Sequence, residues 1–282
     1  MSASAAVASA PSRDVDAERG PTFGRVVWSE WVRFRSLRST WITLGVFVLI
    51  AVGFGALLSF GRVSRWPPPD PGEILTFDPT RHSLGPGAFL GQLVIGVLGV
   101  LVVTGEYSTG MIRATFSAVP HRVTAMGARL VVFVTATLTV LVPTMLVAFL
   151  VGQQIFATKH INTTLGAPNV LRAVIGAALY IVAIGVLGMA LGWLLRHTAG
   201  AIATLFGLLF IVPIIVNLLP SPWPDRVAKW LPGVGDRALG SAIWAVRPVD
   251  GALSPWAGYF MLIAYAAGLL VVGGLLLRAR DV

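Results

Sequence analysis

The chain has 282 residues, of which 56% are hydrophobic and 12% are charged, with a net charge of +9. A soluble domain carries about 25% charged residues, so half that share leaves too little polar surface for a water-soluble protein of this size. Disordered chains are poor in apolar residues, so disorder is excluded for most of the sequence. The composition predicts a polytopic membrane protein. Because the chain has no cysteine, disulfide scaffolds, cysteine zinc sites and thiol nucleophiles are excluded.

The first residues, 1–20, are rich in alanine and serine and carry scattered charges. They lack the basic segment followed by an apolar segment that marks a secretory signal peptide. We expect them to form a disordered N-terminal tail.

Residues 21–40 are expected to form an amphipathic helix at the membrane interface. At about 100° per residue, six apolar side chains between Phe23 and Leu37 fall on one arc of about 140°, while Glu30, Arg33 and Arg38 lie at its edges or within it. A basic, aromatic helix of this kind lies in the plane of the interface and anchors the topology. A second role, as a docking surface for a cytoplasmic partner, stays open. The residues assigned to this interfacial helix are Phe23, Trp28, Glu30, Trp31, Arg33, Phe34, Arg35 and Arg38.

Residues 41–282 are predicted to form an all-α transmembrane domain with six spans. Each stretch approaches the roughly 20 apolar residues that a crossing requires, and counts of five or seven stay open. The second stretch is short, so its start is expected a few residues earlier. Only 196–198 separate the fourth stretch from the fifth, which favours a tight antiparallel hairpin over one broken crossing. The spans are predicted at about 41–60, 87–104, 126–152, 171–195, 199–219 and 256–277.

Charge asymmetry predicts that both termini lie in the cytoplasm. With the N-terminus inside, the inner segments hold 12 of the 21 lysines and arginines, and four arginines (25, 33, 35 and 38) directly precede the first span. The basic excess is therefore assigned to membrane topology rather than to nucleic-acid binding. Arginine outnumbers lysine 19 to 2, which favours a GC-rich bacterial genome.

Segment 104–122, with the sequence TGEYSTGMIRATFSAVPHR, joins the second and third spans on the predicted inner side. Ser108 or Thr109 is suited to cap a short helix, residues 111–118 supply about two turns, and Pro120 ends it. A short helix held between two spans is suited to transmit motion. The alternative is a plain loop whose charges set the topology.

The spans contain no charged residue deep within them, which disfavours an ion-coupled carrier. Gln92 and Asn217 are expected to form hydrogen bonds between helices, and the pattern from Gly188 to Gly192 matches close helix packing. The sequence has no phosphate-binding loop, no H-E-x-x-H motif and no G-x-S-x-G motif. We therefore expect neither an enzyme nor a chain that binds ATP, a metal or another cofactor by these routes.

Three features together resemble the permease subunits of ABC-2 type ABC transporters found in actinobacteria. They are the sequence S-E-W-x-x-x-R-S-x-R-S-T-W from Ser29 to Trp41, the six predicted spans, and the stretch from Gly105 to Arg122, which is the most specific of the three. Such permeases pair as homo- or heterodimers, and a separate cytoplasmic ATPase, in two copies, drives them. This agrees with the missing phosphate loop.

The resemblance implies that the segment after the second span is a coupling element that touches the ATPase. Arg113 and Arg122 would contact that subunit, and Glu106 would brace the segment against the N-terminal helix. The external segment, here 220–255, often forms short helices in such permeases, and it either enters the outer leaflet or is an ordinary loop. The coupling residues implied are Glu106, Tyr107, Thr109, Gly110, Met111, Arg113, Phe116, Pro120 and Arg122.

The function expected from the resemblance is ATP-driven export by a permease subunit that carries no ATPase site of its own. The exported class (drug, peptide, lipid or polysaccharide) is left open. The alternative function is a membrane anchor or accessory protein that does not transport.

Overall fold

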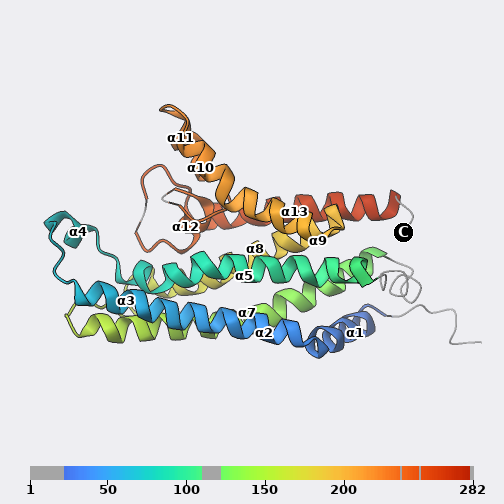
Figure 1. Cartoon of the computed structure of the whole chain (residues 1–282), viewed down its shortest axis with the longest axis horizontal. Helices are drawn as coiled ribbons and strands as arrows, with labels where there is room; N and C mark the ends of the chain where they lie inside the picture. Colours follow the sequence, from blue (N-terminus) through green and yellow to red (C-terminus); the bar gives the residue numbers. More distant parts are fainter. Residues whose placement is uncertain (1–21, 110–121, 236, 248, 280–282) are drawn as a thin grey trace, which may run out of the picture.

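The computed structural model describes residues 22–109, 122–235, 237–247 and 249–279, and every regular element within them is a helix. Six helical segments are long and apolar enough to cross a membrane, which confirms the predicted all-α fold and span count. Figure 1 shows these long helices lying roughly side by side. The six segments are Arg38–Ser64, Pro79–Tyr107, Val123–Ala157, Val170–Leu195, Thr198–Asn217 and Pro255–Leu276.

The first span comprises α2, a π-helical stretch η1 and α3, and the fifth comprises α9, a second π-helical stretch η2 and α10. In chain order, the bounds are α1 (Phe23–Ser36), α2 (Arg38–Leu49), η1 (Ile50–Phe54), α3 (Gly55–Ser64), α4 (Pro71–Thr76), α5 (Pro79–Thr109), α7 (Arg122–Ala157), α8 (Val170–Leu195), α9 (Thr198–Phe206), η2 (Gly207–Ile211), α10 (Val212–Asn217), α11 (Trp223–Val227), η3 (Ala228–Trp230), α12 (Leu239–Trp244) and α13 (Pro255–Ala279).

The second span begins well before the predicted residue 87, because polar residues start its helix. Asp78 accepts hydrogen bonds from the backbone N–H groups of Thr80, at 2.9 Å, and Arg81, at 3.2 Å. A side chain that satisfies these first N–H groups caps a helix. A count of apolar residues misses such polar helix ends. At the other end, α5 continues through Ser108 to Thr109, so these two residues end a long helix rather than begin a short one.

The fourth and fifth spans form the predicted tight hairpin. Arg196 adopts a left-handed conformation with φ of 55°, and its N–H bonds back to the Gly192 carbonyl oxygen at 2.9 Å. The His197 Nδ1 atom then accepts the Gly200 N–H at 3.2 Å and caps α9. The reversal therefore needs only the residues between Leu195 and Thr198.

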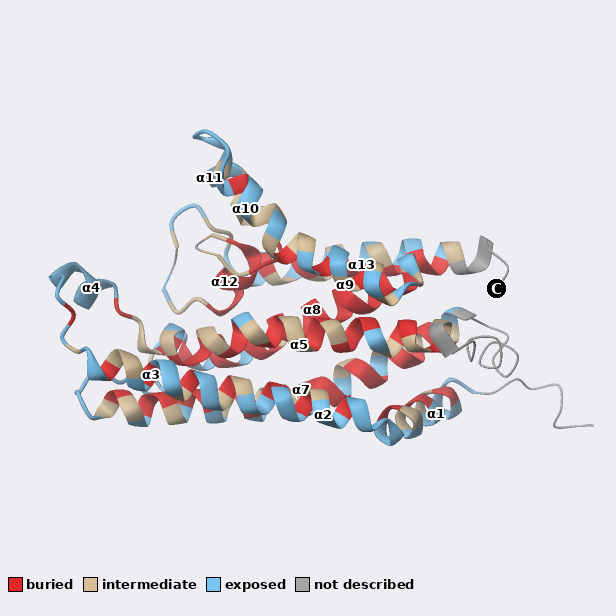
Figure 2. Ribbon diagram, viewed as in Figure 1, coloured by how far each residue is buried: buried red, intermediate tan, exposed pale blue. Residues whose placement is uncertain are grey.

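Helix α8 forms the centre of the bundle. In its most apolar stretch 89% of the residues are buried, and it packs against α5, α7, α9, α12 and α13. Figure 2 shows the buried residues concentrated on α8 and on the faces turned toward it. Glycine lets α5 and α8 approach closely, because a Cβ at Gly99 or Gly188 would overlap the backbone carbonyl oxygen of Gly185 or Gly96. The packing predicted for Gly188 and Gly192 is confirmed, since a Cβ at Gly192 would lie 3.0 Å from Val103.

The two polar residues predicted to join helices differ in outcome. The Tyr180 hydroxyl of α8 donates to the Gln92 side-chain oxygen of α5, which confirms the helix–helix hydrogen bond expected of Gln92. Asn217 instead lies exposed at the end of α10, where it lines a cavity of about 430 Å³ together with Asp225 and Arg237. The prediction for Asn217 is therefore wrong, because its helix ends at the bundle surface.

The two ends of the bundle are built differently. Figure 1 shows α1, the end of α5, the start of α7 and the end of α13 at one end, and α4, α11 and α12 at the other. In the external segment 220–255, all six residues of α12 are buried, and this helix packs against α8 and α13. The segment therefore forms short helices, of which α12 folds back onto the bundle, whereas α11 contacts α10 and η3 and projects away from the long helices (Figure 1).

Candidate functional site

Helix α1 packs against α7 through a stripe of residues spaced four apart. The buried members are Val26, Glu30 and Phe34, and the Phe34 ring meets Phe133 of α7 edge to face at 6.5 Å between centroids. The ends of the predicted apolar arc do not take part, because Phe23 and Leu37 are 50% and 42% exposed. A carboxylate therefore lies at the middle of the buried face, where an apolar residue is expected.

The Glu30 carboxylate is paired with Arg129 of α7. The Arg129 Nε atom donates to Glu30 Oε2 at 3.1 Å, and Nη2 donates to Oε1 at 2.8 Å. Two parallel N–H···O bonds of this kind are the strong bidentate form of the arginine–carboxylate pair. The pair explains how Glu30 is accommodated at only 8% exposure.

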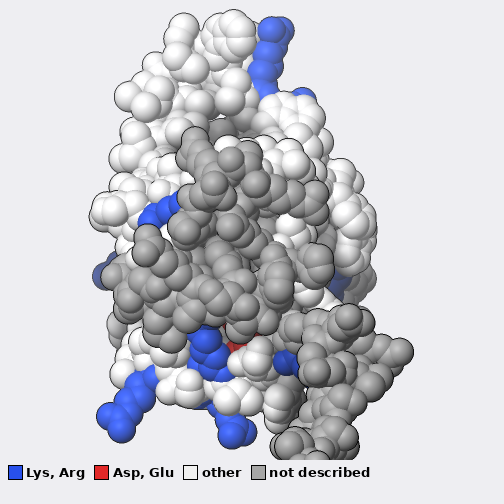
Figure 3. All heavy atoms as spheres, turned by 90° about the vertical axis from the view of Figure 1, so that its right-hand side faces the viewer, with Lys and Arg blue, Asp and Glu red and all other residues white. Residues whose placement is uncertain are grey.

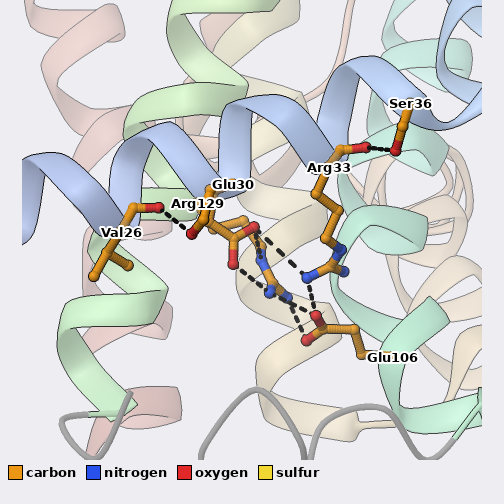
Figure 4. Close-up of polar contacts among 7 residues, drawn as sticks. Val26, Glu30, Arg33, Ser36, Glu106 and Arg129 are labelled. Carbon is orange, nitrogen blue, oxygen red and sulfur yellow. Dashed lines mark hydrogen bonds and ion pairs between the residues drawn. The ribbon is translucent and has the colours of Figure 1, made fainter. Parts of the chain in front are cut away.

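The same guanidinium group binds a second carboxylate, Glu106 in the last turn of α5. Arg129 Nη1 donates to Glu106 Oε2, and Nη2 donates to Oε1, both at 2.9 Å. Arg129 and Glu106 are 2% and 3% exposed. Figure 4 shows Arg129 between the two carboxylates, with Glu30 on α1 and Glu106 on α5. One arginine thus joins three helices.

Arg33 of α1 completes what we call the charge cluster, which consists of Glu30, Arg33, Glu106 and Arg129. The Arg33 guanidinium donates to Glu106 and lies 3.7 Å from Glu30 Oε2. Burial and the neighbouring Arg129 lower the pKa of Arg33, and Glu30 acts in the opposite direction. Two arginines and two glutamates give the cluster no net charge, which suits a site that is mostly withdrawn from water.

Aromatic side chains cover the charge cluster from the side of α8. The Arg129 guanidinium carbon lies 5.4 Å from the centroid of the buried Trp193 ring, within cation–π range. Trp193 meets Tyr107 of α5 edge to face at 6.2 Å, and the Arg196 guanidinium carbon lies 5.8 Å from the Tyr107 ring. The ends of α1, α5, α7 and α8 are therefore held in one connected set of contacts.

The cluster is suited to hold helices in a fixed arrangement. A buried ion pair repays the loss of hydration only when its geometry is good and its remaining hydrogen-bonding capacity is satisfied. All four hydrogen bonds from Arg129 lie between 2.8 and 3.1 Å. Among the residues described, no group of histidines and carboxylates is suited to hold a metal ion.

The structure brings together only part of the predicted site. Glu30, Arg33 and Glu106 meet in the charge cluster, and Phe34, Trp31 and Tyr107 pack into the core beside it. Four other residues of the predicted interfacial helix do not contribute to the cluster, because they are exposed: Phe23, Trp28, Arg35 and Arg38.

Most of the predicted coupling segment lies outside the described residues. Thr109 ends α5 and Arg122 begins α7, and only the backbone is described at these two positions. The predictions that fall outside concern Gly110, Met111, Arg113, Phe116 and Pro120. The structure describes the end of α5 and the start of α7, which lie on either side of these residues. Glu106 of α5 and Arg129 of α7 both belong to the charge cluster.

Arg129 is not among the site residues predicted from the sequence. Arg129 lies inside the apolar segment Val123–Ala157 and is fully buried. The sequence signal for this pair was an arginine within an apolar segment and a glutamate on the apolar arc of α1. A buried charge requires a partner, so these two exceptions to the hydrophobic pattern point to each other.

The end of the molecule beside the charge cluster presents arginines to the outside. Figure 3 looks onto this end, where Lys and Arg side chains gather along the lower edge, over α1, and little acidic surface is visible. Arg25, Arg35 and Arg38 are exposed, whereas Glu30 and Glu106 are buried. The exposed surface near α1 is therefore more basic than the cluster beneath it.

Comparison of the chain with protein-family models and with curated proteins gives no match.

Proposed function

We propose that this chain is the membrane-spanning permease subunit of an ATP-driven ABC-2 type exporter, powered by a separate cytoplasmic ATPase. The observation that carries the proposal is the charge cluster, because it fastens α1 to the two helix ends that flank residues 110–121. A displacement of that segment would reach α1, α5 and α7 together. The resemblance of Gly105–Arg122 to the coupling element of such permeases supplies the ATPase as the source of the displacement.

The topology in this proposal places the charge cluster and both termini in the cytoplasm of a bacterial plasma membrane. Helix α1 would lie at the inner interface, with Arg25 and Arg35 toward the headgroups and Val26 and Phe34 toward the bundle. Two copies of the chain would pair, as in the permeases it resembles, and each copy would bind one ATPase subunit. ATP would bind to that partner, since this chain has no phosphate loop.

Co-purification with a candidate cytoplasmic ABC ATPase that is co-expressed with this chain tests the proposal. The wild-type chain is expected to retain the ATPase. Two variants, Arg113→Glu and replacement of residues 114–117 by a glycine–serine linker, are each expected to lose at least about 90% of the bound ATPase. Loss of one charge-assisted contact accounts for a decrease of this size. Arg226→Glu is the matched control, because it makes the same charge change at an exposed position of α11, at the other end of the bundle.

Two outcomes would contradict the proposal. If the wild-type chain retains no ATPase, the alternative of a membrane anchor without transport is favoured. If the linker variant retains the ATPase and hydrolysis stays coupled to transport, residues 110–121 are not the coupling element.

A further inference from the structure

Two adjoining cavities lie between α8, α12 and α13, at the end of the bundle opposite the charge cluster. The smaller cavity, of about 260 Å³, has apolar walls that include Ile175 and Ile243. The larger one, of about 560 Å³, shares Arg172, Pro255 and Trp256 with it. The shared residues make the pair one continuous site with an apolar part and a polar part.

The charged residues that line this pair of cavities are both cations. Arg172 donates from Nη1 to the Ile243 carbonyl oxygen at 3.2 Å and from Nη2 to that of Ala245 at 2.6 Å. These bonds hold its guanidinium group at the junction and leave three of its five N–H donors for a ligand. Arg247 is exposed in the larger cavity. Among the described residues, neither arginine has a carboxylate within ion-pair distance.

The cavities lie where two of the candidate membrane spans begin. Arg172 lies in the first turn of α8 and Trp256 in the first turn of α13, and both helices are spans that begin here. Leu171, Ile175 and Trp256 are exposed on the outside of the bundle, so the smaller cavity opens toward the surface that lipid would cover. Arginine at this depth is placed to meet phosphate groups, which it binds through paired N–H donors.

We infer that these cavities bind one anionic phospholipid, with an acyl chain in the smaller cavity and the phosphate between Arg172 and Arg247. The inference does not depend on the proposed function. The first turns of α8 and α13 add partial positive charge to the same place. A second copy of the chain covering this face is the other occupant that the experiment below distinguishes.

Native mass spectrometry of the purified chain with equal amounts of phosphatidylglycerol and phosphatidylcholine tests this inference. The wild-type chain is expected to retain one phosphatidylglycerol molecule and to prefer it over phosphatidylcholine by about tenfold or more. One charge-assisted hydrogen bond accounts for a preference of this size. Arg172→Gln and Arg247→Gln are expected to abolish the preference. Lys159→Gln is the matched control, because it removes one exposed charge at the same end of the bundle and is expected to leave binding unchanged.

A second variant separates lipid binding from the fold of α12, which Arg172 also supports. Ile175→Trp fills the apolar cavity without touching the arginine hydrogen bonds, and it is expected to reduce the binding of both lipids. Equal retention of the two lipids by the wild-type chain would overturn the inference, as would an equal loss in Lys159→Gln. Full competition by glycerol phosphate would show a site for a soluble anion instead. A shift from dimer to monomer in Ile175→Trp, with lipid counts unchanged, would show that a second copy covers this face.

Discussion

Replacement of Arg129 by methionine is expected to lower the free energy of unfolding by about 3–5 kcal/mol, the cost of leaving buried charges without their partner. The substitution takes the arginine partner from Glu30 and Glu106, which are only 8% and 3% exposed in the structure. Arg33 alone does not replace Arg129, because its side chain is still 29% exposed and it supplies a single contact to each carboxylate. Denaturant-induced unfolding in mild detergent, compared with wild type, measures the effect.

Two controls identify the cause of that loss. The triple variant Glu30→Gln, Glu106→Gln, Arg129→Met leaves only Arg33, which reaches water, so most of the stability is expected to return. Glu73→Gln removes the charge of an exposed ion pair with Arg62 and is expected to cost less than about 1 kcal/mol. If the triple variant is as unstable as Arg129→Met, the loss comes from packing rather than from unpaired charge.

Replacement of Gly99 by alanine is expected to cost about 3 kcal/mol or more, because a single added methyl group forces α5 away from α8. The Cβ would overlap the Gly185 carbonyl oxygen and come within 3.2 Å of the Met189 nitrogen. Both atoms belong to the backbone of α8, the most buried helix, so no side chain is able to move aside. The thermal unfolding midpoint of the detergent-solubilised chain is expected to fall sharply.

Gly105→Ala on the same helix is the matched control. A Cβ there meets nothing within 4 Å, so this variant is expected to be neutral or to gain up to about 1 kcal/mol from better helix propensity. Similar destabilisation by the two substitutions would show that helix geometry in α5, rather than its contact with α8, is responsible.

The fold was largely predictable from the sequence because apolar length decides where a helix crosses a membrane. Six apolar stretches gave six helices, and the short connection at 196–198 gave a tight hairpin. The start of α5 was misplaced because Asp78 and the polar residues after it begin the helix without adding apolar length. Apolar counts describe the part of a helix that is inside the membrane, whereas capping residues decide where the helix begins.

The candidate site was less predictable because its partners are distant in sequence. Ninety-nine positions separate Glu30 from Arg129, and 23 separate Glu106 from Arg129. The helical periodicity of the sequence placed Glu30 on or near the apolar arc of α1. The periodicity does not indicate which helix that arc faces. Only the packing of α1 against α7 and of α5 against α7 brings the three residues together.

A distance measurement tests whether ATP on the partner ATPase moves the far end of the bundle through the charge cluster. The chain has no cysteine, so spin labels attach only at Ile74→Cys and Leu218→Cys, two exposed positions outside the cluster. Pairing one labelled copy with an unlabelled copy leaves a single distance between the two labels. With the ATPase bound in nanodiscs, trapping ATP is expected to shift this distance in the otherwise wild-type chain. The same labels in the Glu30→Gln, Glu106→Gln, Arg129→Met background are expected to show no shift. An unchanged distance in the otherwise wild-type chain, or an equal shift in both chains, would contradict transmission of the motion through the charge cluster.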